Sequence, residues 1–172
     1  MPVKRQSANS TFKKVVVLRL DHNHLPGYLD PAQLGCGEII DLLTLEGERQ
    51  ALALSEVKGV YFVREFGEPF ELQRKVYLSR PRQEGLWVRL RFTDGDQFEG
   101  LVPNDLLSML DHGIQITPPD LSGNSFRVFI PRSALAQVVV LGVVGQARRA
   151  RPAPTVPAPQ RGLFESPADD SE

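Results

Sequence analysis

The chain has 172 residues, of which 41% are apolar and 24% charged, and its formal net charge is −1. This is enough for two small units of about sixty residues each, near the lower limit for a self-supporting core. No apolar run has transmembrane length, no signal peptide is evident, and a single Cys excludes an internal disulfide. We therefore expect a cytoplasmic protein that does not engage a membrane.

A first set of strands is predicted between residues 13 and 66, after a short disordered segment over residues 1–12. Alternating and apolar stretches separated by turns indicate the strands, and an Asp before a Pro indicates a helical turn. In chain order these elements are Val16–Leu20, Leu25–Tyr28, a helical turn opening at Asp30, Glu38–Leu45, Gln50–Leu54 and Val57–Val63.

The same series recurs between residues 85 and 145, so the sequence predicts an internal repeat. Its elements are Val88–Phe92, Phe98–Leu101, a helical turn over Asn104–Leu110, Gly113–Thr117, Arg127–Pro131 and Leu135–Leu141. The first turn of this copy contains Asp94-Gly95, which suits a tight hairpin. The corresponding turn at Asp21–His24 counts as one residue shorter, so we expect its geometry to differ. Residues 67–84 are predicted to form a connecting strand or hairpin.

Charge is distributed unevenly along the chain. Residues 15–145 hold twelve basic and seventeen acidic residues, whereas residues 146–172 are neutral overall and rich in Pro, Ala and Arg. A tail of that composition is expected to be disordered. An acidic body argues against nucleic-acid phosphate as the principal target.

One basic strip departs from this acidic balance. Its side chains combine positive charge with an aromatic ring, as in proteins that hold a single-stranded backbone and stack its bases. The same residues also suit the solvated outer face of strands. The possible nucleic-acid contacts are Arg74, Lys75, Arg80, Arg82, Trp87, Arg89 and Arg91.

Candidate catalytic groups are few, and we predict neither an enzyme nor a cofactor. Asp21, His22 and His24 have side chains that can bind a metal ion. The same residues are also explained by their place in a turn, without a metal. Cys36 lies between two glycines with no nearby His to activate it. No phosphate-binding Gly-rich loop or nucleophile elbow is present in the sequence.

The segment Asp120–Ser125 resembles half of the cyclic-dinucleotide motif of PilZ barrels. It departs from that motif because Ser125 stands where a Gly is required and no Arg-x-x-x-Arg lies shortly before it. A turn between strands is the alternative explanation. A cyclic-dinucleotide-sensing β-barrel is the third functional hypothesis.

The tail contains a short peptide, Gln160-Arg161-Gly162-Leu163-Phe164. Gln160, Leu163 and Phe164 are similar to the Gln-x-x-Leu-Phe peptides by which bacterial proteins dock to the DNA polymerase sliding clamp. The Gln offers a donor and an acceptor, and the apolar pair supplies two anchors on a flexible tether. An incidental peptide, or one for a different partner, remains the alternative.

Three stretches, residues 56–66, 85–96 and 131–135, resemble an uncharacterised bacterial family with two Sm-like or SH3-like β repeats, over about residues 13–145. The resemblance implies no activity. The final bends, Leu54-Ser55-Glu56 and Pro131-Arg132-Ser133, lack the loop Asn and Gly-Lys/Arg pairs by which RNA-binding Sm proteins grip uridines.

Together these observations predict an all-β protein of two tandem small Sm-like or SH3-like barrels, each with a short helical turn, flanked by disordered termini. The leading functional hypothesis is a non-catalytic adaptor that binds a protein partner through its body and the sliding clamp through its tail. The alternative is an Sm-like single-stranded nucleic-acid-binding protein that uses the basic strip.

Overall fold

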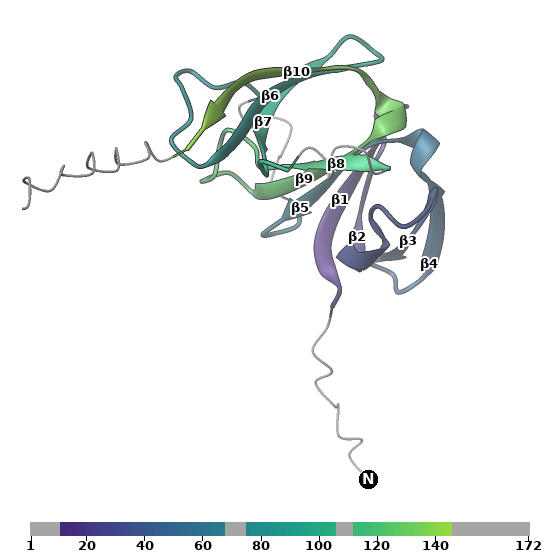
Figure 1. Ribbon diagram of the computed structural model, residues 1–172. Coiled ribbons are helices and arrows are strands. Elements are labelled where there is room, and N and C mark those ends of the chain that lie inside the picture. The colour runs from purple at the N-terminus through teal and green to yellow at the C-terminus, as the bar shows by residue number, and fades with distance from the viewer. Residues whose placement is uncertain (1–10, 68–74, 106–111, 146–172) are drawn as a thin grey trace, which may run out of the picture.

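The computed structural model describes residues 11–67, 75–105 and 112–145, and this part of the chain is all-β, as predicted. The described residues form ten strands and three 3₁₀ turns and contain no α-helix (Figure 1). All pairings between these strands are antiparallel.

The first half of the protein, residues 13–63, contains five strands. They are β1 (Lys13–Arg19), β2 (His24–Leu29), β3 (Ile39–Thr44), β4 (Arg49–Ala53) and β5 (Val57–Val63). The 3₁₀ turn η1 (Pro31–Gln33) follows β2, and η2 (Leu54–Glu56) precedes β5. The side chain of Asp30 accepts the N–H of Ala32 at 3.0 Å, which confirms the helical turn predicted at this Asp.

The second half, residues 85–144, also contains five strands in the part that the structure describes. They are β6 (Gly85–Phe92), β7 (Gln97–Val102), β8 (Gly113–Ile116), β9 (Ser125–Pro131) and β10 (Leu135–Val144), with the 3₁₀ turn η4 (Arg132–Ala134) before β10. Most of the helical turn predicted over Asn104–Leu110 lies outside the described residues.

The first hairpin turn has the same geometry in both halves, which corrects the expectation that the turn at Asp21 is shorter. Arg19 N–H donates to Asn23 O at 3.0 Å, and Phe92 N–H donates to Asp96 O at 2.8 Å. His22 and Gly95 take corresponding positions with φ of 66° and 93°. The aspartate before each of them accepts a backbone N–H two residues later, so both turns are Asx turns, and His22 takes the positive-φ position that Gly95 holds in the second half.

Neither sheet closes into a barrel, so the expected pair of closed barrels is not formed. One sheet has seven strands in the order β4-β3-β2-β1-β5-β9-β8, and the other has three in the order β10-β6-β7. The seven-stranded sheet crosses from one half to the other because β5 pairs with β9 from Val60–Phe129 to Val63–Ser125. Residues 75–84 form no strand, and this direct pairing joins the halves where a connecting hairpin was expected.

The two strands at this crossing supply side chains to both hydrophobic cores. Val60 and Phe62 of β5 lie in the core of the first half together with Phe129 of β9. On the opposite face of the sheet, Tyr61 of β5 packs against the core of the second half, which contains Val128 of β9. Since successive residues of a strand point to opposite faces, one pair of strands contributes to two cores.

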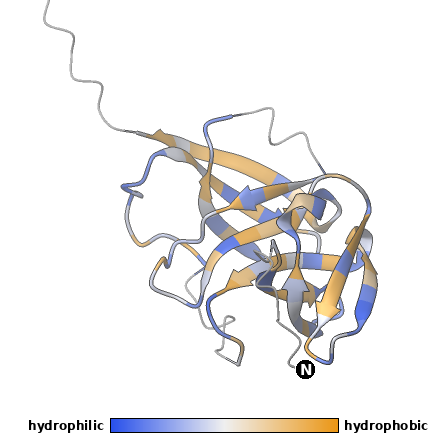
Figure 2. Cartoon of the chain, turned by 90° about the horizontal axis from the view of Figure 1, so that it is seen from below, coloured by the Kyte–Doolittle hydropathy of each residue, from blue (hydrophilic) through white to orange (hydrophobic). Residues whose placement is uncertain are grey.

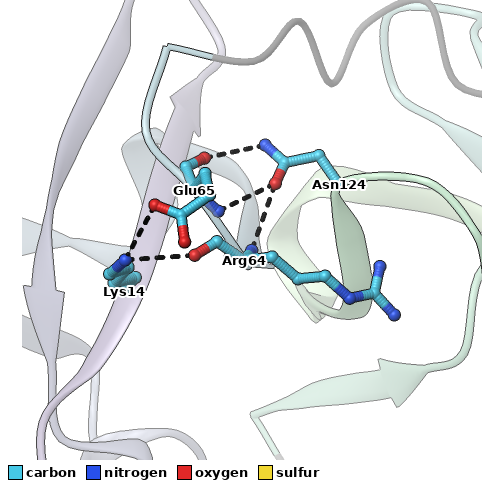
Figure 3. Close-up of polar contacts among 4 residues, drawn as sticks. All are labelled: Lys14, Arg64, Glu65 and Asn124. Carbon is cyan, nitrogen blue, oxygen red and sulfur yellow. Dashed lines mark hydrogen bonds and ion pairs between the residues drawn. The ribbon is translucent and has the colours of Figure 1, made fainter.

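The junction between the halves is also held by polar contacts (Figure 3). The side-chain oxygen of Asn124 accepts the backbone N–H groups of Arg64 and Glu65 at 3.1 and 3.0 Å, and its amide donates to Glu65 O at 2.9 Å. Lys14 of β1 donates to Arg64 O at 3.2 Å and to the Glu65 carboxylate at 3.1 Å. The end of β5 is thereby fixed to β1 and to the loop before β9.

Two buried glycines mark the second strand of each half. A Cβ on Gly27 would lie 2.5 Å from Leu43 O, and one on Gly100 would lie 2.6 Å from Thr117 O and collide with Ile116. Both glycines lie where the strand crosses closely over the third strand of its own half, so the backbones can approach only without a side chain.

We predict that Gly100→Ala destabilises the protein by about 1–3 kcal/mol, because the added methyl must displace Ile116 or the backbone at Thr117. Urea unfolding followed by the fluorescence of the single Trp measures the effect. Gly142→Ala is the matched control, since a Cβ there has no neighbour within 4 Å. Equal stability of the two variants would contradict the close approach described above.

Candidate functional site

A cleft of about 760 Å³ lies between the two halves, where their final 3₁₀ turns come together. In Figure 1 these turns are the short coils at the start of β5 and β10, next to each other. Both halves contribute to its lining, which consists of Gly35, Glu38, Ile39, Ala53, Leu54, Ser55, His112, Arg132 and Ser133.

Corresponding backbone bonds position the two walls of this cleft. Leu54 N–H donates to Glu38 O at 2.7 Å in the first half, and Arg132 N–H donates to His112 O at 2.9 Å in the second. Each bond ties a 3₁₀ turn to the residue that precedes the third strand. Across the cleft, the Ser133 hydroxyl donates to Leu54 O at 3.2 Å, so the two turns are also bound to each other.

The walls of the cleft differ in polarity. Ile39 is 62% exposed, although it is an apolar residue at the end of a core strand. Glu38 stands next to it on the wall of the first half, whereas Arg132 and His112 lie on the wall of the second half. A lining that combines an exposed apolar side chain with groups of opposite charge suits a peptide segment more than a polyanion.

A buried cation also bridges the two halves. The side chain of Lys58 in β5 is 5% exposed and pairs with Asp94 and, at 2.6 Å, with Asp96 in the β6–β7 turn. Burial lowers the pKa of Lys58, but the hydrogen bonds that its ammonium donates to both carboxylates outweigh this effect, so the net pKa lies above its ordinary value. Burial raises the pKa of Asp94, but the bond from Lys58 outweighs this and the net pKa is lowered.

The basic strip is partly neutralised by a buried acid that lies outside it in sequence. Glu99 of β7 is 2% exposed and accepts two hydrogen bonds from the Arg89 guanidinium, at 2.9 and 2.7 Å. It also accepts the indole N–H of Trp87 at 3.2 Å and the backbone N–H of Tyr77 at 3.1 Å. Burial and the charge of Glu99 raise the pKa of Tyr77 to about 12.

The remaining described residues of the strip come from two segments, β6 and residues 75–84. Lys75, Arg82 and Arg91 are exposed, and the exposed Arg80 donates to Val143 O at 2.9 Å. Arg74 lies outside the described residues. Because Arg89 already donates two hydrogen bonds to one carboxylate oxygen of Glu99, it is less available to a phosphate than its exposure suggests.

The segment similar to the cyclic-dinucleotide motif is engaged in local structure. Asp120 accepts both the N–H and the hydroxyl of Ser122, and Asn124 forms the junction contacts of Figure 3. The Arg64 guanidinium donates to Leu121 O at 3.0 Å and to Gly123 O. These contacts agree with a structural turn.

The sequence of residues 11–142 identifies the family of the chain. A family model described as a family of unknown function (DUF6982) matches residues 11–142. The chain belongs to this family. No curated protein and no solved structure matches it.

The DUF6982 match spans β1 to β9 and most of β10, and therefore includes both walls of the cleft. It ends before the tail peptide: Gln160, Leu163 and Phe164 lie beyond it and also outside the residues that the structure describes. The family description assigns no activity to either part.

Other candidate groups take ordinary structural roles. Cys36 is exposed, and its thiol donates to Ala32 O at 3.1 Å. Within residues 11–67, 75–105 and 112–145, no three His, Cys, Asp or Glu side chains gather as metal ligands. No helix in the described part of the chain is long and apolar enough to cross a membrane.

Sequence reasoning missed both Glu99 and the cleft. The pairing of Glu99 with Arg89 could have been predicted, because the β6–β7 hairpin places the two residues directly opposite each other. The cleft had no such signal, since Glu38 and Arg132 are brought together only by the packing of one half against the other.

We predict that Asp94→Asn lowers the free energy of unfolding by about 1 kcal/mol near neutral pH, because Lys58 keeps Asp96 as its second partner. The pKa of Asp94 is depressed on folding, so its contribution is present above the ordinary value of 3.8 and is lost as pH falls below it. Urea unfolding at pH 7 and pH 3 measures the difference.

Asp21→Asn is the matched control for that experiment. Asp21 occupies the corresponding turn position, and its ionic partner is the partly exposed Arg19 at 3.7 Å. A loss in Asp94→Asn that is no larger than in Asp21→Asn, or that does not diminish between pH 7 and pH 3, would contradict the role given to Lys58.

Proposed function

We propose that this protein is a non-catalytic adaptor that binds a protein segment in the cleft between its halves and recruits a second partner through its tail. The observation that carries the proposal is the cleft itself, whose lining combines the exposed Ile39 and Glu38 of the first half with Arg132 and His112 of the second. A concave site with a few apolar anchors and charged groups at its margins is typical of peptide recognition.

We further infer that each half derives from one ancestral SH3-like or Sm-like barrel that opened at one seam. In support, both halves run through strands and a 3₁₀ turn in the same order, and their first hairpins carry the same backbone bonds. Folds of this kind have many functions, so the resemblance supports a binding scaffold without choosing its ligand.

The tail supplies the second contact in this proposal. Gln160, Leu163 and Phe164 have the spacing of clamp-docking peptides, and the preceding Pro- and Ala-rich residues form a tether of suitable composition. Two adjacent apolar side chains in an otherwise polar segment are the usual form of a short docking anchor.

Single-stranded nucleic-acid binding through residues 74–91 is the weaker alternative. Its basic side chains are spread over several segments, and Glu99 binds both Arg89 and Trp87, the residues best placed to hold a phosphate and a base. A cyclic-dinucleotide sensor is weaker still, because Asp120 and Asn124 are used to build the turn and the junction.

The tail prediction is that the full chain binds purified bacterial sliding clamp and that Leu163→Ala with Phe164→Ala weakens this binding at least about tenfold. Calorimetric titration measures both affinities. Arg161→Ala is the matched control, because this position lies inside the peptide but is not one of its three anchors. Equal affinities for the wild type and the double variant would exclude clamp docking through this peptide.

The cleft prediction concerns random peptides selected by phage display against the full chain. We expect the selected peptides to bind Ile39→Lys at least about tenfold more weakly than the wild type, because the exposed apolar anchor is lost. Leu45→Lys, at an equally exposed apolar position just beyond the other end of β3, is the control. Peptides that bind Ile39→Lys as tightly as the wild type would contradict the cleft proposal. A salt-sensitive mobility shift of single-stranded RNA by the protein would favour nucleic-acid binding.

A further inference from the structure

β10 presents a long apolar edge that is separate from the cleft. It has ten residues, pairs with β6 alone among the described strands, and carries no charged side chain (Figure 1). Val138, Val139, Val140 and Val143 are 38%, 39%, 48% and 57% exposed, and the strand is mostly apolar along its length (Figure 2). Such an edge is a template for pairing with another strand.

The first half shows what covers the corresponding strand. Like β10, β5 follows a 3₁₀ turn and pairs with the first strand of its half, and both pairings shift register near the start of the strand. Val60 and Phe62 hold the places of Val138 and Val140, yet they are only 0% and 2% exposed. One difference between the strands is that β5 has a strand on both sides, β1 and β9, whereas β6 is the only described strand beside β10. Near the end of β10, the Arg80 side chain donates to Val143 O.

The strand that corresponds to β9 in the first half is β4, and it is also a free edge. Within the part of the chain that the structure describes, β4 pairs with β3 alone, and its residues Arg49, Gln50 and Ala51 are exposed. Their counterparts in β9 include Val128 and Phe129, which are 0% and 2% exposed. β10 and β4 are therefore two free sheet edges, and they correspond to β5 and β9, the two strands that pair with each other within the chain.

We propose that β10 of one copy pairs antiparallel with β4 of a second copy, in the arrangement that β5 and β9 adopt within the chain. Transfer of the internal register places Val138 opposite Ala51 of the second copy, Val139 opposite Gln50 and Val140 opposite Arg49. No like charges oppose each other, because β10 is uncharged, and the alkyl stems of Arg49 and Gln50 can cover the valines.

This contact is heterologous, since each copy gives one strand and receives another. A pair of copies still has one free β10 and one free β4, so association continues to a closed ring or an open filament. Pairing of two β10 strands about a two-fold axis would instead stop at a dimer, and the stoichiometry distinguishes the two arrangements.

Sedimentation velocity of the purified full chain over a concentration series tests the proposal. We expect species larger than a dimer to accumulate as concentration rises. Val140→Lys places a cation opposite Arg49 and is expected to raise the concentration for half-association at least about tenfold. Adding Arg49→Glu to the same chain restores association, because the opposed charges then attract.

Controls separate loss of the interface from loss of the fold. Leu78→Lys changes an apolar residue that is 79% exposed and lies off both edges, and should leave association unchanged. Thermal unfolding is compared for all variants. Arg132 lines the same groove as Val140, so a Lys at position 140 adds a second cation to that groove and can lower the stability of the fold. If Val140→Lys is unstable, Val139→Lys on the opposite face replaces it.

Three results would overturn the proposal. The first is a monomer at every concentration, and the second is association that stops at a dimer. The third is a folded Val140→Lys variant that associates like the wild type, or whose loss of association is not reversed by Arg49→Glu.

Discussion

The pairing of β5 with β9 is the interaction on which the rest of the structure depends. It joins the halves into one seven-stranded sheet, and it places alternate residues of each strand in different cores. Phe129 belongs to the second half but lies in the core of the first. Tyr61 belongs to the first half but packs against the core of the second. The cleft exists because this pairing sets the two final 3₁₀ turns against each other.

Local signals in the sequence predicted the strands well. The alternation of Val88, Leu90 and Phe92 with polar residues has the period of a half-buried strand, and the structure buries all three. Asp30-Pro31 and the turn residues supplied the boundaries. These features depend on neighbours in the chain, which is why they can be read without knowledge of tertiary contacts.

The partner of each edge strand could not be predicted in the same way. The structure buries residues on both faces of β5 and β9, but the residue pattern of a strand does not say which other strand lies beside it. The expectation of two closed barrels assumed that each half pairs only with itself. Of the site, Glu99 could have been found from the hairpin register, whereas the cleft depends on contacts between distant segments. The role of the tail peptide stays a prediction.

The exchange of Phe129 and Tyr61 between the cores has a consequence for how the chain can be divided. A cut between residues 67 and 75 would leave two pieces, each lacking an aromatic side chain that fills its interior and a strand that borders its sheet. Such pieces are not autonomous domains. They are complementary fragments, of the kind that regain their native form only when mixed, and the duplicated pattern of strands therefore conceals a single folding unit.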